Sequence, residues 1–180
     1  SRGGTLRAEG RWGPEQADLR ATLTALPVAG LAALAAPDLG VEGTIGAEAR
    51  VTGPVADPAA RFRLEAGGLR FTDPSMRGLP VGRVVVEGTA GARAADIRLD
   101  AAAGTALRAT GTARLPGGFA GNAPITARLE ANSDLAALGG PLLAAGAQRV
   151  TGRATLQVDV SGTVGAPRTT GRASVANATF

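Results

Sequence analysis

The stretch GTIGAEARVT, residues 43–52, alternates apolar and polar side chains at a period of two. In an extended strand, successive side chains point to opposite faces, so the apolar members of this stretch share one face and the charged and hydroxyl members share the other. The apolar members are Ile45, Ala47, Ala49 and Val51. This pattern is typical of a half-buried β-strand.

The same alternation recurs along the rest of the chain. It is found at residues 19–25, 62–66, 97–101, 107–113 and 125–131, and Gly, Pro, Asp and Asn residues stand between these stretches. Such residues favour turns. The sequence therefore predicts an all-β chain of about ten strands. At residues 83–87 three consecutive valines leave the apolar face ambiguous.

Two short segments depart from the strand pattern. Residues 28–36 are rich in Ala and Leu, and residues 133–143 place Leu135 and Leu138 at helical spacing after Ser133 or Asp134, either of which can cap a helix. We expect each segment to form a short helical plug at an end of the sheet.

Composition restricts the chemistry that this chain of 180 residues can perform. Apolar residues make up 44% and aromatic residues only 3%, so a core must be built from Ala, Val and Leu; there is no His, Cys, Lys or Tyr. These absences remove the common catalytic triads and dyads, Schiff bases and nearly all zinc sites. A catalytic pair of carboxylates, as in glycoside hydrolysis, remains conceivable among Asp96, Asp100, Glu130 and Asp159. These residues alternate with apolar residues, so we interpret them as part of a solvated face. We expect a protein that is not an enzyme and uses no cofactor or metal.

The charge pattern does not favour a nucleic-acid partner. The net charge is +4, and the basic residues, all of them Arg, are scattered among acidic residues. A nucleic-acid surface clusters its cations and adds stacking aromatic residues. We therefore expect no nucleic-acid partner.

An internal repeat divides the chain. Residues 41–71 align with residues 150–180 without a gap, at a constant offset of 109, and eight of the thirty-one positions are identical. Residues 4–10 recur with one insertion as residues 104–111. We therefore expect a first β repeat unit over 1–103 and a second over 104–180, truncated at its C-terminal end, as in a piece of a longer protein. Strand-based units of this kind stack on their neighbours.

The clearest repeated phrase is VSGTVGAPRTTGRASVAN, residues 160–177, which resembles the recurrent V-x-G-T-[LV]-x-x-P-x-x-x-G-x-[LA]-x-[LV]-x-[ND] pattern of TamB and AsmA-like proteins. Residues 51–64 are a weaker copy, in which Pro54 replaces the Thr and Phe62 the second Gly. Residues 88–112 are similar to the strand pairs of the same family.

The resemblance implies an elongated, curled β-sheet of stacked repeats, shaped like a half-pipe or taco with an apolar interior, and the two short helical plugs expected above would belong to it. It implies a place in the periplasm, within an inner-membrane-anchored protein of outer-membrane biogenesis and phospholipid transport. The expected partners are a phospholipid or another acyl-chain ligand, adjoining repeats of the same chain and an outer-membrane Omp85-type protein (TamA). The trough would shield acyl chains or apolar β-strands of client proteins. Expected lining residues are Val41, Ile45, Val51, Phe62, Leu64, Ile97, Leu99, Leu107, Ile125, Leu129, Val160 and Val175.

Two alternatives fit the same alternation. The apolar faces could meet one another in a closed sandwich core, which period-two patterning predicts equally well. The chain could also be a segment of a structural or adhesive β-solenoid in an exported surface protein. Against the solenoid stand the 109-residue repeat, which is longer than most β-helix rungs, and the inserted helical segments.

Overall fold

The structure, a computed structural model, describes residues 3–29, 40–73, 79–142 and 151–179. The expectation of an all-β chain of about ten strands is confirmed for these residues. The strands are β1 (Thr5–Trp12), β2 (Gln16–Pro27), β3 (Val41–Pro54), β4 (Ala59–Phe71), β5 (Gly82–Gly91), β6 (Ala95–Ala103), β7 (Leu107–Leu115), β8 (Thr126–Asp134), β9 (Thr151–Thr163) and β10 (Ala166–Thr179), and the helix α2 (Leu135–Leu142) follows β8.

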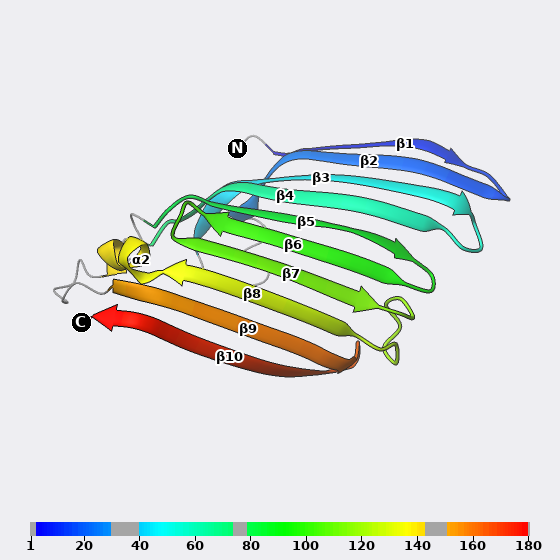
Figure 1. Cartoon of the computed structure of the whole chain (residues 1–180). Coiled ribbons are helices and arrows are strands. Elements are labelled where there is room, and N and C mark those ends of the chain that lie inside the picture. Colours follow the sequence, from blue (N-terminus) through cyan, green and yellow to red (C-terminus); the bar gives the residue numbers. More distant parts are fainter. Residues whose placement is uncertain (1–2, 30–39, 74–78, 143–150, 180) are drawn as a thin grey trace.

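All ten strands belong to one sheet, and their spatial order is their order in the chain (Figure 1). Each strand pairs antiparallel with its sequence neighbours, so β1 and β10 form the two edges and the sheet is not closed into a barrel. Short turns suffice for such a meander because antiparallel neighbours need no crossover connection. The predicted boundary between residues 103 and 104 falls in the β6–β7 turn, and strand pairing continues across it.

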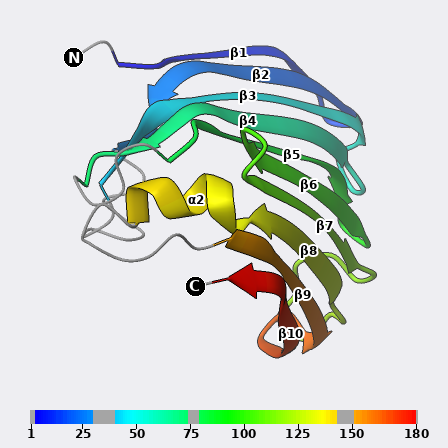
Figure 2. The same cartoon turned by 60° about the vertical axis from the view of Figure 1, so that its left-hand side comes forward.

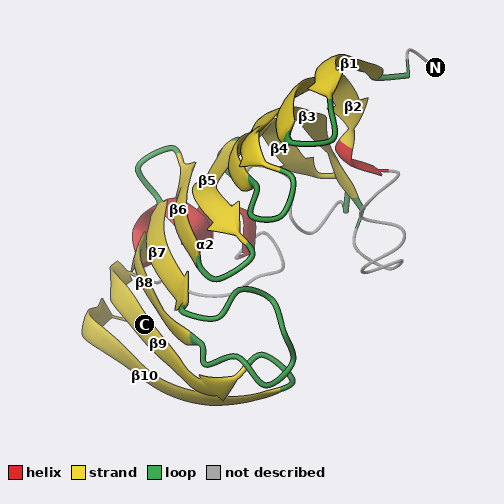
Figure 3. Ribbon diagram, turned by 90° about the vertical axis from the view of Figure 1, so that its right-hand side faces the viewer, coloured by secondary structure: helices red, strands yellow, loops and turns green. Residues whose placement is uncertain are grey.

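The sheet is arched across the direction of its strands, and α2 lies on the concave side of the arch (Figure 2). Figure 3 shows the strands twisting progressively from β1 to β10. The helix contacts β8 and β9, and the Asp134 carboxylate accepts a hydrogen bond from the Ala136 N–H at 2.9 Å, as expected of a cap. Most of the other predicted helical segment, 28–36, lies in residues 30–39, outside the described residues.

The two hairpins predicted to be equivalent, β3–β4 and β9–β10, share their unusual backbone conformations. Three positions in each hairpin have a positive φ, and each position in the first hairpin has its counterpart 109 residues later in the second. The pairs are Gly43 and Gly152 (144° and 128°), Gly53 and Gly162 (106° and 96°), and Gly68 and Asn177 (65° and 54°). The prediction that residues 41–71 and 150–180 form the same strand–turn–strand unit is therefore confirmed for their described parts.

The third pair marks a recurrent β-bulge. Gly68 in β4 and Asn177 in β10 each lie at a shift in strand register, and so does Ala25 in β2, which has a φ of 54°. All three strands run in the same direction, so the bulges lie toward one end of the sheet. A bulge bends its strand and increases the local twist. This position explains the Asn that ends the repeated phrase, because Asn tolerates the left-handed conformation better than other residues with a Cβ.

The bulge in β2 provides a stability test. The left-handed conformation costs a residue with a Cβ about 1–2 kcal/mol, and part of this is offset because Gly loses more chain entropy on folding. We therefore expect Ala25→Gly to raise the free energy of unfolding by about 0.5 kcal/mol, measured by urea denaturation. A decrease in stability would contradict the bulge assignment. The control is Ala8→Gly, which removes a methyl group where the backbone φ is not positive and should destabilise.

Candidate functional site: the two faces of the sheet

Strand register gathers the apolar side chains on one face, defined here as the apolar face. Residues directly opposite each other in neighbouring strands point to the same side, so the register connects them into rows that cross the whole sheet. One row consists of Leu6, Leu23, Ala47, Leu64, Val86, Leu99, Gly111, Leu129, Val158 and Gly171. Large and small side chains alternate along much of this row, so neighbouring side chains fit beside each other.

Most of the predicted lining residues fall on this face. Leu64, Leu99 and Leu129 share the row just described. The adjacent row contains Phe62, Ile97 and Val160. The rows that flank these two contain Val51 on one side and Ile45 on the other. Leu107 and Val175 share a row near one end of the sheet, and Val41 is opposite Phe71. Ile125 immediately precedes β8, and its N–H donates to the Gly162 carbonyl at 3.0 Å. The register thus brings ten of the twelve residues to one side of the sheet, while Val41 lies beyond the register shift in β3 and Ile125 lies before β8.

Several residues of the apolar face were missed in the sequence. In β5 the register assigns Val84 and Val86 to the apolar face, opposite Ala66 and Leu64, and Val85 to the other face, opposite Glu65. Three consecutive valines leave the apolar face ambiguous in the sequence, and the pairing partners show which of them lie on it. Leu19 and Leu23 belong to the alternating stretch 19–25 and were left out of the named lining residues. The other members not named there are Leu6, Leu156 and Val158, and their alternation with polar residues was a usable signal.

The apolar face has no second layer of strands within the described residues. Its side chains are mostly half-buried, and the buried apolar residues of the described chain are mainly alanines. Toward the edges, Leu6 is 69% exposed and Val175 59% exposed. In a closed sandwich a second sheet would cover the apolar face, whereas the described strands form one open sheet.

The opposite face, defined here as the charged face, is crossed by ion pairs between neighbouring strands. Their N–O distances range from 2.7 to 3.9 Å, and all the side chains are substantially exposed. The pairs are Arg20–Glu48, Arg50–Asp18, Arg63–Glu87, Arg83–Glu65, Arg108–Asp100, Arg114–Asp96 and Arg128–Asp159. Exposed pairs contribute little stability one by one, but opposite charges across strands favour this register over a shifted one.

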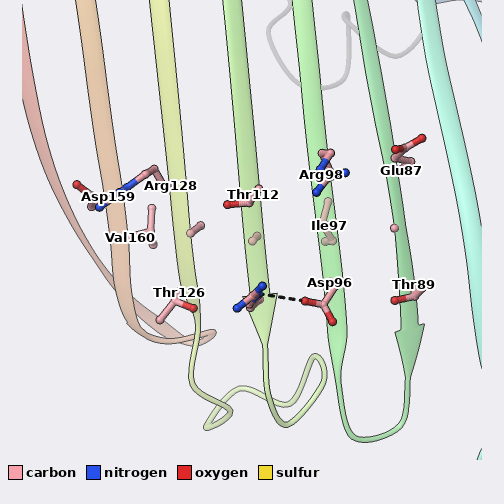
Figure 4. A pocket seen from close by; sticks show the side chains of 14 residues that line it. Glu87, Thr89, Asp96, Ile97, Arg98, Thr112, Thr126, Arg128, Asp159 and Val160 are labelled. Atoms are coloured by element: carbon pink, nitrogen blue, oxygen red, sulfur yellow. Dashed lines mark hydrogen bonds and ion pairs between the residues drawn. The ribbon is translucent and has the colours of Figure 1, made fainter.

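The carboxylates considered as an acid pair lie on this charged face, where Asp96, Asp100 and Asp159 have Arg partners. A shallow hollow of about 650 Å³ extends over β5 to β9 and includes Asp96 and Asp159 (Figure 4). A hydrogen bond from Arg128, aided by one from Gln157, lowers the pKa of Asp159. The pKa of Glu65 is lowered mainly by a hydrogen bond from Arg83.

These lowered pKa values predict acid sensitivity. A carboxylate whose pKa is lower in the folded state contributes stability above its unfolded pKa of about 4 and loses it as the pH falls through the folded value. We expect the double variant Glu65→Gln/Asp159→Asn to be less stable than the parent above about pH 5 and equally stable near pH 2. Urea midpoints measured across this range test the expectation. A difference that does not change with pH would contradict it.

The described residues contain no group of three or more His, Cys, Asp or Glu side chains arranged to hold a metal ion. Among the same residues, no helix combines the length and apolar character needed to cross a membrane.

The fold and the site together define a class: an open antiparallel β-meander with one apolar and one charged face. Comparisons of this chain with protein families, curated proteins and solved structures find no match.

Proposed function

We propose that the chain is a trough segment of a TamB/AsmA-like cell-envelope protein that shelters lipid acyl chains in the periplasm. The observation that supports this most directly is the apolar face, which continues in register through all ten strands and lacks a second layer in the described part of the chain. An apolar surface of this extent favours a ligand or partner of the same character.

The dimensions of the face suit an acyl chain. The short strands β6, β7 and β8 have nine residues each, which corresponds to about 30 Å at 3.3 Å per residue. One leaflet of a bilayer contributes about 15 Å of hydrocarbon, half of the bilayer core. An acyl chain lying along a strand would therefore remain within the width of the sheet.

The half-pipe form is part of this proposal. The apolar face would line the concave side of the arch, and α2 would close one end as a plug. Adjoining repeats would extend the trough at β1 and β10. An Omp85-type protein would be the partner of the trough at the outer membrane. Apolar β-strands of client proteins would be a second kind of cargo.

The β-solenoid alternative, with its role in display or adhesion, is less well supported. The rungs of a β-helix stack as parallel strands, whereas every neighbouring pair of described strands here is antiparallel. The meander therefore favours the trough.

Native mass spectrometry of the purified chain tests the proposal. We expect phospholipid to co-purify with the chain, and a delipidated sample to bind a fatty acid through its alkyl chain. Absence of both would reject the lipid role. A peptide with an apolar β-strand sequence, added in competition, would distinguish protein cargo from lipid.

A further inference from the structure

Three arginines stand side by side on the charged face. Arg20 in β2 is directly opposite Arg50 in β3, and Arg50 is directly opposite Arg61 in β4. Like charges directly opposite across antiparallel strands are destabilising. The arrangement therefore departs from the pairing of opposite charges that prevails elsewhere on this face.

Neighbouring acids compensate only part of this charge. Arg50 makes two hydrogen bonds to Asp18, at 3.2 and 3.1 Å, and Arg20 approaches Glu48 at 3.9 Å. Glu9 is opposite Arg20 on β1. Arg61 forms no ion pair within the described residues, so its guanidinium is available to a ligand.

The three side chains border a hollow of about 370 Å³, and Arg63 and Glu48 complete its charged lining. The side chains of Arg20, Arg50 and Arg63 are 59%, 62% and 49% exposed, so solvent and solutes reach them freely. Within the described residues Arg20, Arg50 and Arg63 each have an acidic partner, at 3.9, 3.1 and 2.7 Å, and Arg61 has none, so the positive charge left without a partner at this hollow is that of Arg61.

The second hairpin shows that the fold does not need this row. At the offset of 109, Arg50 and Arg61 correspond to Asp159 and Thr170 in β9–β10, and Thr170 is directly opposite Asp159. The same strand–turn–strand unit is thus built with an acid and a hydroxyl where the first hairpin has two arginines. The arginine row is a feature of one repeat and not a requirement of the hairpin.

We propose that Arg20, Arg50, Arg61 and Arg63 form a binding site for a phosphate group. A guanidinium presents a planar set of donors that matches phosphate oxygens, often two at a time, and an anion bound among the three opposed arginines relieves their mutual repulsion. The phosphate can belong to inorganic phosphate or to the headgroup of an anionic phospholipid. The site is on the opposite side of the sheet from the apolar face, so it stands independently of the proposed trough.

The variant Arg61→Thr introduces the residue type that the second hairpin has at the equivalent position, Thr170, and it tests the proposal. Arg98→Thr is its matched control. Arg98 lies on the same charged face, forms no ion pair within the described residues and is outside the row. Both variants remove one positive charge. Urea denaturation verifies folding, and Arg61→Thr should be at least as stable as the parent because a like-charge contact is removed.

Binding is measured by calorimetry with inorganic phosphate at low salt and by co-sedimentation with vesicles of phosphatidylcholine alone or mixed with phosphatidylglycerol. We expect Arg61→Thr to weaken binding about tenfold, and Arg98→Thr to bind as the parent does. Loss of phosphate affinity identifies free phosphate as a ligand, and loss confined to the phosphatidylglycerol vesicles identifies the headgroup. Equal losses in the two variants, or no binding by the parent to either probe, would overturn the proposal.

Discussion

Leu64→Arg is expected to abolish phospholipid retention while leaving the sheet folded. Leu64 is half-buried in the middle of the apolar face, between Ala47 and Val86. An arginine there would put a charge where acyl chains are proposed to lie, which is unfavourable in an apolar environment. Because the face is open, the guanidinium can reach water, so the loss of stability should remain near 1–2 kcal/mol. Native mass spectrometry and urea denaturation measure the two effects.

Thr110→Arg is the matched control for this experiment. It adds the same charge to the opposite face, where Thr110 lies between Asp100 and Glu130 in the register, and it should leave lipid retention unchanged. Val160→Asp repeats the test with a negative charge in an adjacent apolar row. Two results together would contradict the trough and favour a closed core: the parent retains no lipid, and both apolar-face variants unfold. Unfolding is expected of a closed core because an unpaired charge in a sealed interior is far more costly.

Gly53→Ala is expected to lower the free energy of unfolding by about 2 kcal/mol. Gly53 has a φ of 106°, which residues with a Cβ rarely adopt, and the equivalent Gly162 has a φ of 96°. A Cβ added at Gly53 would meet no atom closer than 3.6 Å. The expected loss therefore arises from backbone strain and not from a steric clash, and urea denaturation measures it directly.

Gly67→Ala is the control for Gly53→Ala, because Gly67 has no positive φ and its added Cβ would meet nothing within 4 Å. This change should be neutral or slightly stabilising, since Ala restricts the unfolded chain more than Gly does. If the two substitutions had equal effects, the positive φ assigned to Gly53 near the end of β3 would be wrong.

Local pattern in the sequence was sufficient to predict the strands. Residues 43–52 alternate at a period of two, and the structure extends them into β3 with the predicted apolar members on one face. The repeat was also visible, because positions such as Gly53 and Gly162 require a conformation that favours glycine and therefore recur. Both features depend on short stretches of chain, and alternation and turn propensity report such stretches directly.

Register and layering needed the tertiary structure. The three consecutive valines of β5 leave the apolar face ambiguous in the sequence, and pairing with Leu64 and Ala66 on β4 assigns Val84 and Val86 to it. The opposition of Arg20, Arg50 and Arg61 is likewise invisible in the sequence, where these residues are separated by 30 and 11 positions. Alternation assigns each side chain to a face, but it does not specify which residue lies opposite or whether another layer covers that face. Those properties depend on contacts between distant segments, and here such contacts make one open sheet in the described part of the chain.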